Sequence, residues 1–148
     1  MFMLRLAVLL GWIAAAAPAW AGTLAPGNYR FELQSGGRSR SYLVHVPPQA
    51  ASATLPVVVS LHGGGGNAEQ HRRSTGMDAA ADRDGYIAVY PNGSGRLRER
   101  LLTWNAGHCC GYAQAEGVDD VGFIVLVVPE LEVIHNASRL VGDRCCIA

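Results

Sequence analysis

The strongest constraint on the fold is an apolar run that passes directly into a glycine-rich turn. Residues 56–61, Pro-Val-Val-Val-Ser-Leu, have the character of a strand that is buried on both faces. His62 and four consecutive glycines, residues 63–66, follow it. A helical stretch then ends at Asp84, before the next expected strand at residues 86–90. This order of strand, turn, helix and strand predicts a βαβ unit, and therefore a parallel sheet with helices on its faces.

Two segments upstream of this unit predict a β-hairpin. Residues 28–34 and residues 41–46 are rich in aromatic and β-branched side chains, which favour strands. Between them lie residues 35–38, Ser-Gly-Gly-Arg, which have the composition of a turn. We therefore predict an α/β fold in which the sheet is mostly parallel and the N-terminal hairpin lies at its edge.

A further helix is predicted to begin at Asp119 and Asp120, because carboxylates suit a helix N-terminus. A catalytic pair of carboxylates is disfavoured there, since neighbouring residues on a helix point about 100° apart. Pro129 lacks the amide hydrogen that a helix interior requires. The helix is therefore expected to kink at this residue or to begin again at Glu130.

The charge balance argues against a nucleic-acid partner. The chain of 148 residues has 12 basic and 12 acidic residues, and its formal net charge is zero. No net field therefore attracts nucleic acid or anionic lipid. A local cluster of Arg96, Arg98 and Arg100 lies beside Glu99 and is expected to form a solvated loop.

The N-terminus has the pattern of a secretory signal peptide. A short start that contains Arg5 precedes an apolar core at residues 6–17 and a small-x-small cleavage site at residues 19–21. The core is shorter than the roughly 18–20 residues that cross a bilayer, and a retained membrane anchor is the alternative. Residues 1–21 are therefore expected to be removed. The mature protein is expected to be secreted, either extracellular or periplasmic, and to have no membrane partner.

The four cysteines occur as two adjacent pairs, and disulfides in an oxidising compartment are their favoured role. Adjacent cysteines lack the Cys-x-x-Cys spacing that brings two thiolates to one zinc ion. No metal site is therefore expected, despite His108 beside the first pair. Four cysteines permit three full pairings, and the sequence does not select among them. The disulfide candidates are Cys109, Cys110, Cys145 and Cys146.

The glycine run after the predicted buried strand is the most informative candidate site. Glycines allow the backbone to bend so that peptide N–H groups point into a cleft, where they can hold an oxyanion. A plain flexible turn is the alternative, but the position after a buried strand and beside His62 favours the functional interpretation. A dinucleotide-binding loop is disfavoured, because Asn67, Ala68 and Glu69 follow the run and the third glycine of that motif is missing.

Five sequence segments together resemble a known family. They are residues 41–47 (SYLVHVP), 61–67 (LHGGGGN), 90–93 (YPNG), 104–111 (WNAGHCCG) and 118–124 (VDDVGFI). Over about residues 28–124, the chain resembles the secreted serine esterases that include extracellular polyhydroxybutyrate depolymerases and feruloyl or acetylxylan esterases. The resemblance implies a partial α/β-hydrolase fold. It also implies an enzyme that needs no cofactor and acts on an ester-bearing polymer or a small ester.

The same resemblance assigns roles to individual residues. The amide of Gly64 is the leading candidate for the oxyanion hole, followed by the amides of Gly63 and Gly65. The first cysteine pair is expected to hold the loop that forms the floor of the site. The residues expected to contact substrate are His62, Trp104 and Asn105.

The sequence departs from this family at the nucleophile. In the family, a Gly-x-Ser-x-Gly turn carries the catalytic serine. No serine of this sequence has glycine both two residues before it and two residues after it. The likeness fades after Ile124, which divides the chain into residues 1–21, residues 22–124 and a divergent tail at residues 125–148. We expect a truncated or frame-shifted sequence without an identifiable catalytic triad, which is inactive alone.

Such a chain would have an unpaired sheet edge, and self-association through that edge is expected. The alternative function is a non-catalytic secreted module that binds a polymer or polysaccharide through Trp104 and neighbouring tyrosines. Turnover of a short-chain ester separates the two classes, because a binding module retains polymer without hydrolysing esters.

Overall fold

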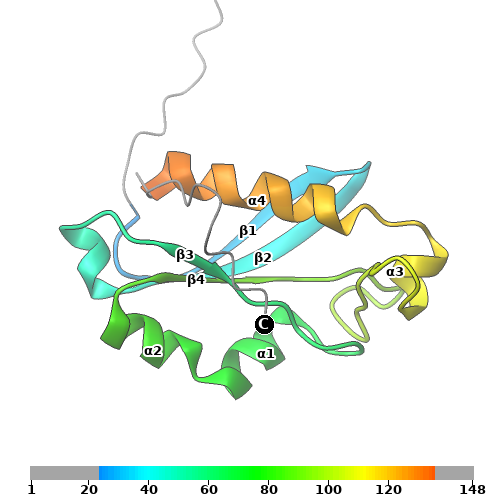
Figure 1. Cartoon of the computed structure of the whole chain (residues 1–148), viewed down its shortest axis with the longest axis horizontal. Helices are drawn as coiled ribbons and strands as arrows, with labels where there is room; N and C mark the ends of the chain where they lie inside the picture. The colour runs from blue at the N-terminus through cyan, green and yellow to red at the C-terminus, as the bar shows by residue number, and fades with distance from the viewer. Residues whose placement is uncertain (1–23, 136–148) are drawn as a thin grey trace, which may run out of the picture.

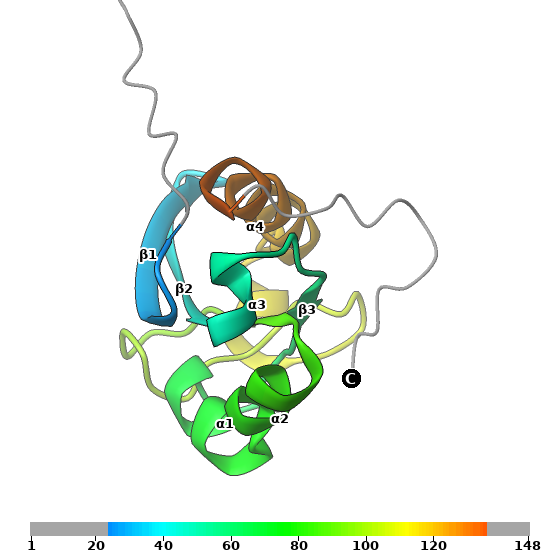
Figure 2. The same cartoon turned by 90° about the vertical axis from the view of Figure 1, so that its left-hand side faces the viewer.

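The structure, a computed structural model, describes residues 24–135, and the predicted signal peptide lies outside this range. The strands are β1 (Gly27–Ser35), β2 (Arg38–Val46), β3 (Val57–Val59) and β4 (Ile87–Pro91). The helices are η1 (Pro48–Ala51), α1 (Ala68–Thr75), α2 (Met77–Asp84), α3 (Gly111–Ala115) and α4 (Asp120–His135). The strands form one sheet in the spatial order β1-β2-β4-β3. Helix α4 covers one face of the sheet, and α1 and α2 cover the other (Figure 1, Figure 2).

Strands β1 and β2 form the predicted hairpin, in which Ser35 pairs with Arg38 at the closed end. The turn consists of Gly36 and Gly37, whose φ angles of 57° and 72° lie in the left-handed region. A two-residue turn with this geometry matches the twist of the flanking strands, and glycine adopts it at low energetic cost. Local sequence is therefore sufficient to determine this turn.

Strands β3 and β4 pair in parallel, with Val57 opposite Ile87, as the predicted βαβ unit requires. Strand β2 pairs with β4 in antiparallel orientation, with Val44 opposite Val89. The described sheet is therefore mixed and has fewer parallel pairs than the sequence predicts, because the hairpin contributes two of its four strands. All five residues of β4 are buried, and the outer strands of the described sheet are β1 and β3.

The helical stretch predicted between β3 and β4 consists of two helices of eight residues each, α1 and α2. Gly76 separates them, and its φ angle of 66° lies in the left-handed region. A second left-handed glycine, Gly85 with φ of 74°, ends α2 directly before β4. Left-handed glycines commonly end helices, so these two residues interrupt a pattern that otherwise predicts one helix.

Helix α4 begins at the two predicted aspartates and continues past the proline. Oδ1 of Asp119 accepts a hydrogen bond from the amide of Gly122 at 2.8 Å, which satisfies a free N–H group of the first turn. The helix includes Pro129, so the expectation that it begins again at Glu130 is wrong. Buried side chains lie on both sides of the proline, and their packing against the sheet offsets the hydrogen bond that proline removes.

Two apolar layers hold the helices on the sheet, and the side chains of β2 alternate between them in the two-residue period of a strand. The buried core on the α4 face consists of Tyr42, Val44, Val46, Leu55, Val57, Val59, Ile87, Val89, Phe123, Val127 and Leu131. The smaller core beneath α1 and α2 consists of Leu43, Ala68, Ala81, Ala88 and Tyr90. Within residues 24–135, no helix is both long and apolar enough to cross a membrane.

Candidate functional site

The glycine run follows the C-terminal end of β3. The amide of Ser60 donates to the carbonyl of Val89 on β4 at 2.8 Å, which extends the ladder one residue beyond β3. His62 follows two residues later and is buried, with 3% of its surface exposed. The sheet and a buried imidazole therefore fix the start of the run, and the predicted position of the glycines at a strand end is confirmed.

The imidazole of His62 links the glycine run to the loop after β4. Its Nε2 accepts a hydrogen bond from the amide of Gly93 at 3.0 Å, and its Nδ1 lies 2.8 Å from the carbonyl oxygen of Gly63. An amide can only donate, so the neutral ring carries its proton on Nδ1 and donates it to Gly63. Burial lowers the pKa of His62, which favours this neutral form. Both ring nitrogens are used within the protein, so the structure supports a positioning role where the sequence predicts a substrate contact.

The four glycine amides divide into two that are paired and two that are not. The amide of Gly65 donates to the carbonyl of Leu102 at 2.8 Å, and the amide of Gly66 donates to the carbonyl of Gly63 at 3.0 Å. The amides of Gly63 and Gly64 have no acceptor among residues 24–135, and both residues are exposed. Two free amides on neighbouring residues can donate to one oxyanion. Gly65 is therefore a correction to the predicted oxyanion set, because its donor is already occupied.

Asn92 is a positioning residue that the sequence-based prediction of site residues omits. Its Oδ1 accepts from the amide of Ala68 at the start of α1 at 2.8 Å, and its Nδ2 donates to Oγ of Ser41 on β2 at 3.0 Å. The next residue, Gly93, has no room for a side chain, since a Cβ there would lie 2.5 Å from the carbonyl oxygen of Thr103. The segment Tyr-Pro-Asn-Gly at residues 90–93 is the sequence signal that identifies both positions.

Trp104 and Asn105 lie beside the glycine run, and their polar groups are used internally. Nε1 of Trp104 donates to the carbonyl of His62 at 2.9 Å, and the two rings lie 5.0 Å apart. Nδ2 of Asn105 donates to the carbonyl of Val118 at 3.0 Å, and its backbone amide donates to Oδ2 of Asp120 at 2.7 Å. Trp104 therefore supports the glycine run from within the protein, and Asn105 attaches this loop to the start of α4.

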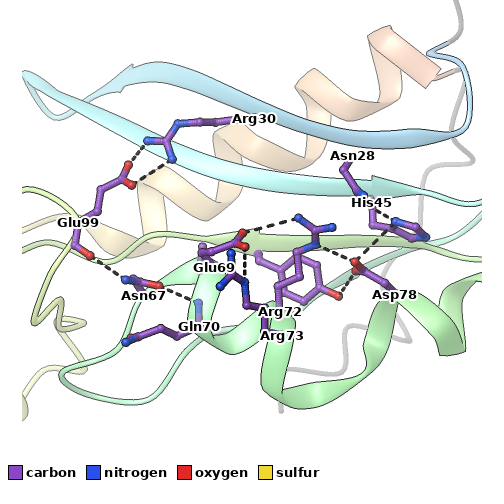
Figure 3. A network of polar contacts seen from close by, with 12 residues as sticks. Asn28, Arg30, His45, Asn67, Glu69, Gln70, Arg72, Arg73, Asp78 and Glu99 are labelled. Atoms are coloured by element: carbon purple, nitrogen blue, oxygen red, sulfur yellow. Dashed lines mark hydrogen bonds and ion pairs between the residues drawn. The ribbon is translucent and has the colours of Figure 1, made fainter.

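A polar network connects the far end of the glycine run to the hairpin (Figure 3). Oδ1 of Asn67 accepts from the amide of Gln70 at 2.8 Å and caps α1, while its Nδ2 donates to the carbonyl of Glu99 at 2.8 Å. The carboxylate of Glu99 in turn pairs with the guanidinium of Arg30 on β1. The loop at residues 92–102 is thus attached both to α1 and to the outer strand of the hairpin.

Two histidines outside the glycine run contact other polar side chains. One ring nitrogen of His45 lies 2.7 Å from Oδ1 of Asn28 (Figure 3). The other lies 2.8 Å from Oδ1 of Asp82. Nε2 of His71 lies 2.7 Å from Oγ of Ser60, and burial lowers the pKa of His71. Helix α1 therefore places the ring of His71 against Ser60, directly after β3. The side chain of His135 lies outside the described residues.

A buried ion pair joins β2 to α4. Nη2 of Arg40 lies 2.6 Å from Oδ1 of Asp120 and 3.1 Å from the carbonyl oxygen of Asn92, and both charged side chains are more than nine-tenths buried. The guanidinium also stacks 4.0 Å over the ring of Phe123. Asp119 caps α4 as predicted, whereas Asp120 neutralises a charge that lies 80 residues away in the sequence.

Only the first of the two cysteine pairs lies within the described residues. Cys109 and Cys110 lie in contact with each other, in the loop between Trp104 and α3. Cys145 and Cys146 lie outside the described residues, so the pairing of the four cysteines stays a prediction.

The sequence is similar to known proteins. The family described as esterase PHB depolymerase matches residues 40–148. A putative esterase, NocK, from Nocardia uniformis subsp. tsuyamanensis is 33% identical over 115 residues, which are 76% of this chain and 31% of that protein. The chain therefore spans about a third of the length of this curated relative.

Solved structures with similar folds are hydrolases. A ferulic acid esterase matches 81% of this chain with a TM-score of 0.53 and 20% identity, and 46% of its own chain is covered. The S-formylglutathione hydrolase FrmB from Staphylococcus aureus matches 76% of this chain with a TM-score of 0.55 and 17% identity, and 43% of its own chain is covered. At these identities the likeness shows the fold, and it confirms the predicted partial α/β-hydrolase architecture.

Proposed function

Since the chain belongs to the esterase PHB depolymerase family, we propose that it carries the oxyanion-binding part of a serine carboxylic-ester hydrolase. The observation that supports this most is the pair of exposed amides at Gly63 and Gly64, for which residues 24–135 provide no acceptor. When a nucleophile attacks an ester carbonyl, the carbonyl oxygen gains the negative charge of the tetrahedral intermediate. The loss of one donor to that oxygen typically costs about 2.7–4 kcal/mol.

The proposal assigns no nucleophile to this sequence, because no serine lies in a Gly-x-Ser-x-Gly segment. Ser60 has a histidine within hydrogen-bond distance, as a nucleophile requires. Ser60 is, however, only 4% exposed, so an ester carbonyl cannot reach its Oγ. We therefore propose that this chain alone does not hydrolyse esters, and that its substrates in a complete enzyme are polymeric or small carboxylic esters.

A chromogenic short-chain ester tests the absence of a nucleophile directly. The full chain is incubated with p-nitrophenyl butyrate and, separately, with a serine-directed fluorophosphonate probe. We expect neither release of p-nitrophenol above the buffer rate nor covalent labelling. Turnover that the phosphonate abolishes would refute the proposal that the sequence lacks a nucleophile.

A loop transfer tests the role of the amides. Residues 61–67 of this chain replace the corresponding loop in an active esterase of the family, and Gly64→Pro then deletes a single N–H donor. We expect kcat to fall by about 10²–10³. Gly64→Ala is the matched control, because it keeps the N–H group at a position where a Cβ meets nothing within 4 Å. Equal rates for the two variants would contradict the assignment.

Export is part of the same proposal and rests on residues 1–21. We propose that the mature protein is secreted and begins at Gly22. N-terminal sequencing of protein recovered outside the cytoplasm checks this, and an intact Met1 there would contradict cleavage.

A further inference from the structure

A cavity with a volume of about 910 Å³ lies next to residues that contact the glycine run. Its walls come from β1, β2 and the loop at residues 92–102. Leu102, which lines the cavity, accepts from the amide of Gly65 at 2.8 Å and donates to the carbonyl of Gly66 at 3.2 Å. Gly93, which also lines it, donates to the ring of His62. Two residues of the cavity wall therefore contact the segment that contains the glycine run, through His62, Gly65 and Gly66.

The charge of this cavity is positive, because its lining includes five arginines and two glutamates. Arg30 pairs with Glu99, and the buried Arg40 pairs with Asp120. The lining arginines that have no acidic partner within 4 Å among the described residues are Arg98 and Arg100.

Two further arginines, Arg38 and Arg40, also line the cavity. Arg38 lies 3.8 Å from Glu116, a long contact, and its Nη1 donates to the hydroxyl of Tyr112 at 3.2 Å. Nε and Nη1 of Arg40 have no hydrogen-bond partner among the described residues, but they are buried and do not face a ligand in the cavity. Guanidinium groups bind carboxylates through two parallel hydrogen bonds, so this lining is suited to a carboxylate.

The neighbouring Arg96 belongs to the same exposed loop but does not line the cavity. All three arginines are exposed, as expected for a solvated loop. The guanidinium of Arg96 lies 5.9 Å from the ring centroid of Tyr112, which itself lines the cavity, whereas Arg98 and Arg100 line the cavity directly.

We propose that this cavity binds a carboxylate carried by the ester substrate, and that Arg98 and Arg100 hold it beside the glycine run. The inference rests on the proposed function, and it narrows the substrate class to esters with a free carboxylate on the acyl or the alcohol part.

A titration of the full chain tests the proposal without any need for turnover. Monoethyl succinate, which carries one carboxylate, is compared with diethyl succinate, its neutral counterpart, by isothermal titration calorimetry or chemical-shift perturbation. We expect the monoester to bind at least about tenfold more tightly than the diester, and increasing salt to weaken only the monoester. Equal affinity for the two esters, or no monoester binding, would overturn the proposal.

Three charge-neutralising variants locate the site. Arg98→Gln and Arg100→Gln are each expected to weaken monoester binding about threefold to tenfold. Arg83→Gln is the control, because Arg83 is an exposed arginine of α2 outside the cavity lining, and it is expected to leave the affinity unchanged. An equal loss of affinity in all three variants would mean that binding depends on the overall surface charge, and it would overturn the assignment. Circular dichroism of each variant verifies that the fold is retained, and the salt dependence of the unmodified chain needs no variant at all.

The two proposals fail separately. If the Gly64→Pro loop transfer retains its kcat while the full chain binds the monoester selectively, the oxyanion assignment is refuted and the carboxylate site is supported. The opposite pair of results would remove the carboxylate site alone.

Discussion

At the scale of single residues, the most consequential contact is the buried ion pair between Arg40 and Asp120. Two buried charges are costly to remove from water, and their mutual attraction compensates only while both are present. The same aspartate accepts from the amide of Asn105, so it also holds the loop that carries Trp104. The pair therefore joins the sheet, α4 and the wall of the candidate site.

Removal of one partner of this pair should destabilise the protein strongly. Asp120→Ala leaves Arg40 buried without a counter-charge, and we expect the free energy of unfolding to fall by about 3–5 kcal/mol. Asp119→Ala is the neighbouring control and removes only the cap of α4, at a cost of about 0.5–2 kcal/mol. Urea denaturation of both variants measures the difference. Equal losses would show that the ion pair contributes little.

The two histidines with lowered pKa values predict how stability depends on pH. Burial holds the pKa of His62 and of His71 below the ordinary value of 6.5. As the pH falls below about 6.5, these histidines are protonated more readily in the unfolded chain than in the folded protein. The free energy of unfolding therefore decreases. Thermal melting at pH about 7.5 and about 5.5 should show this decrease, and His71→Gln should reduce it. A variant with the full pH dependence of the parent would exclude His71 as a contributor.

At the scale of elements, α4 shows how tertiary packing overrides a local signal. The helix buries Phe123 and Val127 before Pro129 and Leu131 after it, all with none of their surface exposed. The proline itself is exposed and contributes no packing to the core. Pro129 therefore destabilises the helix through its backbone, and the burial of neighbouring side chains offsets this loss of stability.

Replacement of this proline should stabilise the protein. Pro129→Ala restores an amide donor within α4 and removes a ring that crowds the preceding turn. We expect the free energy of unfolding to rise by up to about 3 kcal/mol, because no buried contact is lost. Urea denaturation checks this. A fall in stability would mean that the helix needs the local geometry that proline imposes.

At the scale of the whole molecule, the described sheet has two outer strands, β1 and β3. Strand β3 pairs only with β4 among the described strands, and its three residues are all valine. An apolar edge strand with free backbone groups is a template for pairing with another chain. Self-association through β3 therefore stays our expectation.

A charge on this edge should reduce the association. Val58, the half-buried central residue of β3, is replaced by lysine, and we expect the mean mass in sedimentation velocity to move towards the monomer. Val121→Lys is the matched control, because Val121 is an apolar residue on α4 that is 73% exposed. An effect of the control alone would place the contact on α4 and not on the sheet edge.

The sequence alone determined those features whose cause is local. The glycine pair at residues 36–37 specifies the hairpin turn, the apolar run specifies a strand, and Asp119 specifies a helix start. Each depends on side chains within a few positions, since turn geometry, strand periodicity and helix capping act over that range. The position of the glycine run at a strand end follows from the same local pattern.

Only the tertiary structure decided which groups of the candidate site are free. The occupied amide of Gly65, the internal role of His62 and the pairing of Asp120 with Arg40 each depend on a partner about 30 to 80 residues away. Four glycines in a row do not reveal which amides lack an acceptor. That depends on how the loop at residues 92–102 folds back over them, because a donor is free only where no distant carbonyl reaches it.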